Sequence, residues 1–200
     1  MADTASSYLS RTLSASNRKT WTFSTWFKLP DNPVGTKVIW ANSYADDNAN
    51  YAFISIETNM QMIVESANGS NSAMTIATTR KFRDPTSWYH MVVRADTTQS
   101  TAANRLRIYI NGGDAETSFT TNNVVGQNID MGWNMNLEHR IGNFKGLNRN
   151  FNGLLAHTQF CDGNSYGPSS FGEFDSTTNE WKAKLTPNVT YGTNGFFLKW

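Results

Sequence analysis

The segment DPTSWYHMVVRAD, residues 84–96, places a histidine, an arginine and two aspartates within thirteen residues. A histidine beside a carboxylate is the usual partner of a catalytic nucleophile, so this run is the first candidate for an active site. Alternate residues of a strand face opposite sides, which would put only apolar residues on one side and both His90 and Arg94 on the other. We therefore predict the polar half of a half-buried strand, facing solvent or a partner, and not a catalytic cluster.

No other catalytic pattern is complete in the sequence. None of the three histidines lies in a G-x-S-x-G or H-E-x-x-H context. The closest approach to the paired acids of a glycoside hydrolase is GEFDSTTNE, with Glu173, Asp175 and Glu180. The third acid of the E-x-D-x-E spacing falls on a threonine, and the Ser/Thr/Asn content indicates a surface turn. We predict that the protein is not an enzyme, with polysaccharide hydrolysis as the less favoured alternative.

An asparagine- and aspartate-rich loop could bind calcium. Hard cations need several oxygen ligands, and loops of this composition supply them. The spacing of an EF-hand is absent, and such loops are usually turns. The candidate ligands, all within or beside the run ADDNAN, are Asp46, Asp47, Asn48 and Asn50.

A sugar site would use exposed aromatic side chains next to polar groups. Tryptophans that could serve in this way are Trp26, Trp40, Trp88 and Trp133. Residues 84–96 and the partner strand 104–112 add polar and aromatic side chains on their outward side. The candidate ligand-binding residues are Trp26, Trp88, His90, Arg94 and Tyr109.

Short strands would position all of these residues. Runs of alternating apolar and polar residues follow one another between turn clusters, which is typical of an antiparallel β protein. Residues 88–96 and 104–112 should pair as a hairpin, and Pro168 could open one short helix over 166–174. Cys161 follows an aromatic residue in an apolar run, so we expect a small buried side chain. The predicted fold is an all-β, two-sheet antiparallel jelly-roll β-sandwich with at most one short helix.

Composition limits the partners. Charged residues make up 16% of the 200 residues and the net charge is +1, so no field attracts nucleic acid or an anionic membrane. No apolar run approaches the roughly 20 residues that span a bilayer, and we predict no membrane insertion. The length predicts a single domain over 1–200, with residues 1–7 as a candidate flexible arm.

Four stretches carry a resemblance to a known family. They are NRKTWTFSTWFK (17–28), FRDPTSWYHMVVRADTTQSTAANRLRIYINGG (82–113), IGNFKGLNRNFNGLLAHTQFCDGNSYGPSSFGEFD (141–175) and WKAKLTPNVTYGTNGFFLKW (181–200). The chain resembles the laminin-G-like, concanavalin A-like (pentraxin-type) domains of marine bacteriophage virion proteins. GPSSFGEFD and YGTNGFFL are the narrower elements that point to the phage group. His157 stands where the family usually has an acidic residue, and Cys161 where it has an aliphatic one.

The resemblance implies a sandwich whose N- and C-terminal strands lie close together. It implies a non-enzymatic virion structural protein, a capsid decoration or tail-associated fibre or adhesin subunit that contacts other virion proteins. Such a protein would be oligomeric or present in many copies. Because some relatives bind sugars or calcium, it could also bind a host-surface glycan. The alternative is a stand-alone carbohydrate-binding, lectin-like adhesin with or without calcium, and no other cofactor is expected.

The ends of the chain carry two further expectations. The start MADTASSYLSRT lacks the basic and apolar regions of a secretory signal, which predicts synthesis in the host cytoplasm. The resemblance implies a place in the virion. The chain ends at Trp200 without a fibre shaft, a trimerising coil or a catalytic module, which predicts a stand-alone domain.

Overall fold

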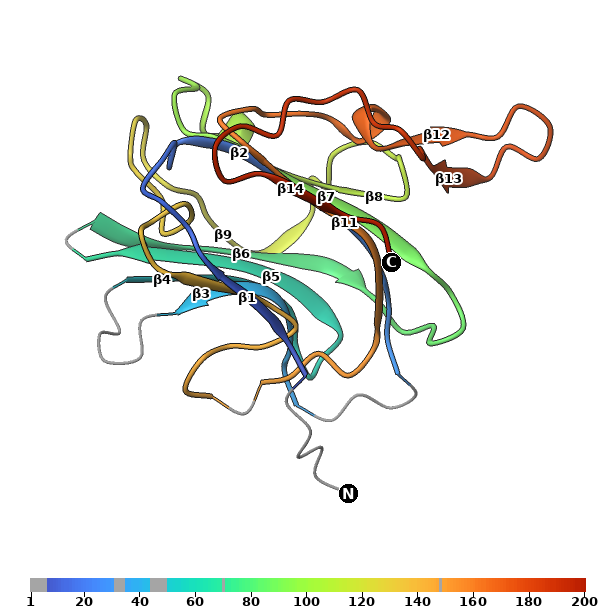
Figure 1. Cartoon of the computed structure of the whole chain (residues 1–200), viewed down its shortest axis with the longest axis horizontal. Helices are drawn as coiled ribbons and strands as arrows, with labels where there is room; N and C mark the ends of the chain where they lie inside the picture. Colours follow the sequence, from blue (N-terminus) through green and yellow to red (C-terminus); the bar gives the residue numbers. More distant parts are fainter. Residues whose placement is uncertain (1–6, 31–34, 44–49, 70, 148) are drawn as a thin grey trace.

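The computed structural model shows two large antiparallel sheets packed face to face (Figure 1). It describes residues 7–30, 35–43, 50–69, 71–147 and 149–200. The described residues contain no α-helix, and the two short 3-10 turns are Ala102–Asn104 and Pro168–Ser170. None of these residues forms a helix with the length and apolarity needed to cross a membrane. The predicted all-β, two-sheet jelly roll is confirmed.

The larger sheet has seven strands in the order β1-β10-β3-β4-β5-β6-β9. Their bounds are β1 (Leu9–Thr12), β10 (Glu138–Ile141), β3 (Lys37–Ser43), β4 (Asn50–Ile56), β5 (Gln61–Asn68), β6 (Asn71–Lys81) and β9 (Phe119–Asn123). The smaller sheet has five strands in the order β14-β11-β2-β7-β8. Their bounds are β14 (Phe196–Leu198), β11 (Leu154–Asp162), β2 (Thr20–Lys28), β7 (Tyr89–Asp96) and β8 (Leu106–Ile110).

A separate hairpin of β12 (Gly172–Phe174) and β13 (Trp181–Ala183) lies outside both sheets. The helix predicted over residues 166–174 is wrong in its extent. Only Pro168–Ser170 forms a single 3-10 turn, because the residues after it pair with β13 instead of continuing a helix. In GEFDSTTNE, the first three residues form β12 and DSTTNE forms the turn to β13, so the predicted surface turn is confirmed for residues 175–180.

A stack of aromatic rings fills the space between the two sheets. Trp40 lies parallel to Phe23 at 4.5 Å on one side and to Trp133 at 4.1 Å on the other, measured between ring centroids. Trp21 meets both tryptophans edge-on. All four rings are at most 1% exposed, so Trp40 and Trp133 are core residues and not surface sugar-binding tryptophans.

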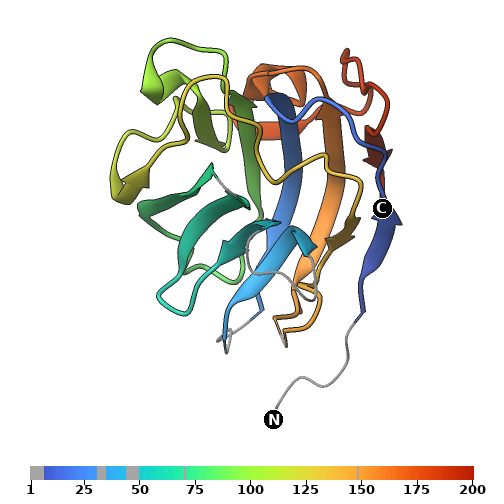
Figure 2. The same cartoon turned by 90° about the vertical axis from the view of Figure 1, so that its left-hand side faces the viewer.

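The two ends of the described chain lie side by side at one margin of the sandwich. Figure 2 shows the C-terminus beside β1. The Ser14 backbone N–H donates to Asn194 Oδ1 at 3.2 Å, and Asn194 Nδ2 donates back to the Ser14 carbonyl at 2.7 Å. The closeness of the terminal strands that the resemblance implied is confirmed.

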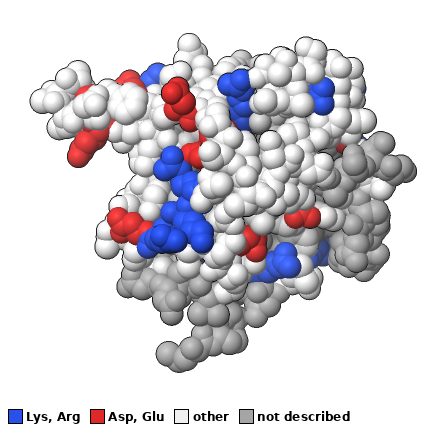
Figure 3. Space-filling model, turned by 180° about the vertical axis from the view of Figure 1, so that it is seen from behind, with Lys and Arg blue, Asp and Glu red and all other residues white. Residues whose placement is uncertain are grey.

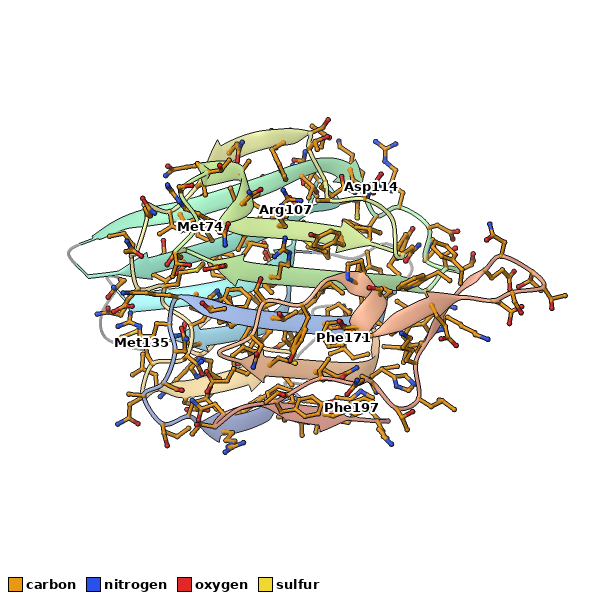
Figure 4. All side chains as sticks on the ribbon, turned by 90° about the horizontal axis from the view of Figure 1, so that it is seen from above. Met74, Arg107, Asp114, Met135, Phe171 and Phe197 are labelled. Carbon is orange, nitrogen blue, oxygen red and sulfur yellow. The ribbon has the colours of Figure 1, made fainter. Side chains whose placement is uncertain are left out.

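The outer face of the five-stranded sheet is covered by the chain that follows β11. Phe171 packs there on Val92 and Cys161, with Tyr166, Val189 and Tyr191 beside them. Figure 4 looks onto this face, where Phe171 lies over the strands. Cys161 is buried as predicted, and burial raises the pKa of its thiol to about 12.

The prediction that the polar side of β7 faces solvent or a partner is therefore wrong at its centre. His90 is 1% exposed and Val92 is fully buried, because residues of this same chain lie over them. Strand alternation separates two faces, but it does not tell which of them a later segment will cover.

Candidate functional site

The structure places four of the five predicted ligand-binding residues in two groups, and Trp88 belongs to neither. Trp26 and His90 are cross-strand partners on β2 and β7, and their rings stack at 5.0 Å. Arg94 belongs to a second group, in which its Nε donates to Tyr109 Oη at 2.9 Å and its Nη1 to Ser165 Oγ at 2.9 Å. The Arg94 group bonds the sheet to the chain after β11, through Ser165. The Trp26 group extends toward the surface.

Four rings form what we call the aromatic ladder: Trp26, His90, Trp181 and Phe174. The His90 and Trp181 centroids lie 5.8 Å apart, and those of Trp181 and Phe174 4.9 Å apart. The ladder thus runs from β2 across β7 onto the β12–β13 hairpin. Phe174 and Trp181 face each other in the hairpin register and share its inner side.

Two glycines let the hairpin approach the sheet. Gly112 follows β8 with a φ of +71°, and a Cβ added there would overlap the Trp181 indole. A Cβ on Gly172 would meet the same ring. Trp181 Nε1 also donates a hydrogen bond to His90 Nδ1 at 2.9 Å. The indole is therefore fixed by close packing on one side and a hydrogen bond on the other.

The hydrogen bonds of His90 determine its tautomer. An indole N–H can only donate, so His90 Nδ1 accepts from Trp181 and the ring proton resides on Nε2. Nε2 then donates to Ser24 Oγ at 2.9 Å. A general base would need the opposite arrangement, with a free Nε2 lone pair toward the hydroxyl. Ser24 and His90 are accordingly a structural pair and not a nucleophile with its base.

The acids of the hairpin are held near a lysine. Glu173 and Asp175 both lie near the Lys182 ammonium, at 3.8 and 2.9 Å. The Lys182 hydrogen bond, with those from the Thr177 and Thr178 backbone N–H groups, holds the pKa of the Asp175 carboxyl well below its usual range. A general acid needs a raised pKa instead. Glu173 also points to the hairpin side opposite Phe174 and Trp181.

The two buried histidines make stability depend on pH. Burial, with a smaller contribution from His157, lowers the pKa of His90 from 6.5 to about 3, and burial lowers that of His139 from 6.5 to about 4. Between about pH 6.5 and pH 4 the unfolded chain binds more protons than the folded one, so stability falls as the pH falls.

We expect urea denaturation between pH 6.5 and pH 5 to show the free energy of unfolding falling with a slope approaching about 1.4 kcal/mol per pH unit for each histidine. The slope should become steeper toward lower pH as the histidines of the unfolded chain become fully protonated. The variant His139→Phe should keep about half of the slope. A free energy of unfolding that does not change across this window would contradict the prediction.

The aromatic ladder reaches solvent at the hairpin, and a further exposed aromatic ring precedes β7. Figure 3 shows the hairpin projecting beyond the body of the molecule. Phe174 is 51% exposed at the hairpin end, and Trp88 is 38% exposed just before β7. The Trp88 Cα lies within about 7 Å of the His90 Cα, because two residues cannot span more. Trp88 makes no ring contact with a described residue, so it lies near the ladder without being joined to it.

The predicted calcium ligands cannot be compared in the same way. Asp46, Asp47 and Asn48 lie outside the described residues, and Asn50 is half-buried at the start of β4. Where the chain is described, no three His, Cys, Asp or Glu side chains gather as a metal site would require.

The two large antiparallel sheets, packed face to face, define a jelly-roll sandwich. The chain belongs to the concanavalin A-like lectin/glucanases superfamily, whose family model matches residues 3–164. A comparison with curated protein sequences gave no significant match.

Two solved structures share the fold. The native heptameric SAP-like pentraxin from Limulus polyphemus has a TM-score of 0.56 at 14% identity, over 100% of this chain and 91% of the pentraxin. Domains LG4-5 of the mouse laminin alpha1 chain have a TM-score of 0.53 at 10% identity, over 81% of this chain and 43% of the laminin chain. At these identities the likeness concerns the fold alone.

Proposed function

We propose that the protein is a non-enzymatic carbohydrate-binding domain and that the aromatic ladder, extended by Trp88, is the surface that contacts the glycan. The observation that carries the proposal is the continuity of Trp26, His90, Trp181 and Phe174 across the sheet and the hairpin. Membership of a lectin and glucanase superfamily supports it. The arrangements of Ser24 and His90 and of Glu173 and Asp175 give no support to hydrolysis.

The physical basis is the amphipathic nature of both surfaces. Aromatic side chains offer a rigid apolar face at low entropic cost, and a sugar ring presents its C–H groups in a similar flat array. The Trp181 indole is held by the His90 hydrogen bond, so the platform is ordered before the ligand arrives. Trp88 and Phe174, as the exposed aromatic rings near and on the ladder, would make the first contacts.

A glycan array with the whole chain tests the proposal. We expect saturable binding to a subset of glycans, weakened at least tenfold by Trp88→Ala or Phe174→Ala, because losing an aromatic contact that is a binding hot spot costs more than about 1.4 kcal/mol. Tyr8→Ala is the matched control, since Tyr8 is 41% exposed but lies beside β1 of the other sheet. An array without binding, or binding that survives both Trp88→Ala and Phe174→Ala, would overturn this assignment.

Calcium dependence can be measured in the same assay. If binding is lost when the array is repeated with a chelator, calcium takes part, and the candidate ligands Asp46, Asp47, Asn48 and Asn50 are the residues to replace next. Binding that persists would leave the aromatic surface as the whole site.

We further propose that the protein acts in a virion, as a capsid decoration or tail-associated subunit present in many copies and in contact with other virion proteins. The motifs GPSSFGEFD and YGTNGFFL support this setting. Binding of a host-surface glycan through the ladder is compatible with it, because the far sheet remains for assembly contacts. Mass spectrometry of purified virions should detect the chain in many copies, and its absence from them would refute the virion role.

A further inference from the structure

An apolar cleft opens at the margin where the edge strands of the two sheets come together. It has a volume of about 320 Å³, which is at the small end of the range for ligand pockets, roughly 300–1,000 Å³. Its walls come from β1, β3, β10, β14 and the residue after β1. The apolar side chains that line it are Leu9, Leu13, Trp40, Ile141, Phe196 and Leu198.

One cation faces this apolar cleft. Arg11 on β1 pairs with His139 on β10, and Leu9 pairs with Ile141. Paired residues lie on the same face of a sheet, and His139 and Ile141 are buried toward the interior at 4% and 8% exposed. Arg11 and Leu9 therefore also point inward, although β1 is an exposed edge strand.

The Arg11 guanidinium has no carboxylate beside it. Throughout the described parts of the chain, no side-chain hydrogen bond or ion pair is made by Arg11. By contrast, the neighbouring Arg140, on the other face, bonds to Glu138 at 2.7 Å and to Asn143 at 2.8 Å. The cleft thus combines apolar walls with one positive charge that lacks a counter-charge.

A structural explanation accounts for part of this arrangement. An inward-pointing charge on an edge strand discourages pairing with the edge of another sheet. That explanation covers Arg11, but it leaves the apolar cleft itself and Leu9, which is 48% exposed at its margin, without a role. An amphipathic anion would satisfy all three features, because its apolar part would cover the walls and its charge would pair with Arg11.

We propose that this cleft binds a medium-chain fatty carboxylate, with the alkyl chain between β1 and β14 and the carboxylate at Arg11. The site is separate from the aromatic ladder and does not depend on glycan binding. The size of the cleft favours a short chain over a long one.

Isothermal titration of the whole chain with hexanoate, octanoate and decanoate tests the chain-length requirement. Each methylene that enters the cleft should tighten binding about fourfold, which corresponds to about 0.8 kcal/mol per buried CH₂. Octylamine, which has the same chain and the opposite charge, should bind at least tenfold more weakly than octanoate. Equal affinity for the two, or no saturable heat with any of the three acids, would overturn the proposal.

A charge reversal tests the role of Arg11. Arg11→Glu should weaken octanoate at least tenfold and reverse the preference toward octylamine. Arg83→Glu makes the same charge change at an exposed position outside the cleft and should leave both affinities unchanged. If Arg11→Glu left octanoate binding intact, the proposed site would be refuted. Increased self-association of Arg11→Ala, which removes the inward charge, would then assign edge protection to Arg11.

Discussion

Replacing Trp40 with alanine is expected to lower the free energy of unfolding by about 3–5 kcal/mol. Trp40 is the middle ring of a three-ring stack, 4.5 Å from Phe23 and 4.1 Å from Trp133, and it is 1% exposed. The substitution removes a large apolar area and leaves a cavity that the two neighbouring rings, one on β2 and one in the loop before β10, cannot both move to fill. Urea denaturation would measure the loss, and the melting temperature should fall by roughly 6–20 °C.

Trp200→Ala is the matched control for this prediction. Trp200 is 50% exposed, and its ring makes no aromatic contact with any described residue. The same change of residue type should therefore alter stability by less than about 0.5 kcal/mol. If Trp40→Ala also cost less than 1 kcal/mol, the stack would not be the centre of the core.

The second large effect is expected at Asp162, which is 3% exposed. Its carboxylate accepts hydrogen bonds from Asn134 Nδ2 at 2.6 Å and from the Asn194 backbone N–H at 3.1 Å. Asn194 in turn donates to Asn134 Oδ1 at 2.9 Å and to the Ser14 carbonyl at 2.7 Å. This buried network joins the N-terminal segment, the loop before β10 and the segment before β14.

Asp162→Ala would leave two buried donors without an acceptor, and each such donor costs about 1–3 kcal/mol. We expect the free energy of unfolding to fall by about 3 kcal/mol, measured by urea denaturation at pH 7. Ser14→Ala should be nearly neutral, because Ser14 contributes only its backbone groups to the network. If Asp162→Ala proved as mild as Ser14→Ala, the network would have no part in holding the terminal segments together.

Much of the fold follows from local patterns in the sequence. Alternation in residues 20–28 predicts that Trp21, Phe23 and Phe27 share one face, and all three are fully buried between the sheets. The same pattern predicts the inward row of β7 and its pairing with β8, both of which the structure confirms. These features depend on neighbours a few residues apart, so a period of two is sufficient to locate them.

The site depends on contacts that no local pattern describes. Trp26 and His90 could be named as ligand-binding candidates, but Trp181 and Phe174 were missed. Trp181 meets His90, and Phe174 meets Trp181, from a hairpin some ninety residues later in the chain. The only sequence signal was the pair of glycines, Gly112 and Gly172, which leave room for the Trp181 ring. Nothing in their local sequence says which ring will occupy that space.

The sequence by itself determined the strands, their two-faced character and the jelly-roll class, because hydrophobic burial selects the faces of each strand from adjacent residues. Only the tertiary structure decided which outward face is open. The chain after β11 folds back over the five-stranded sheet and buries the His90 side of β7. The aromatic rings that remain exposed near it are Trp88, just before β7, and Phe174 on the hairpin. The cleft at Arg11 was decided in the same way, by edge strands that are far apart in sequence and adjacent in space.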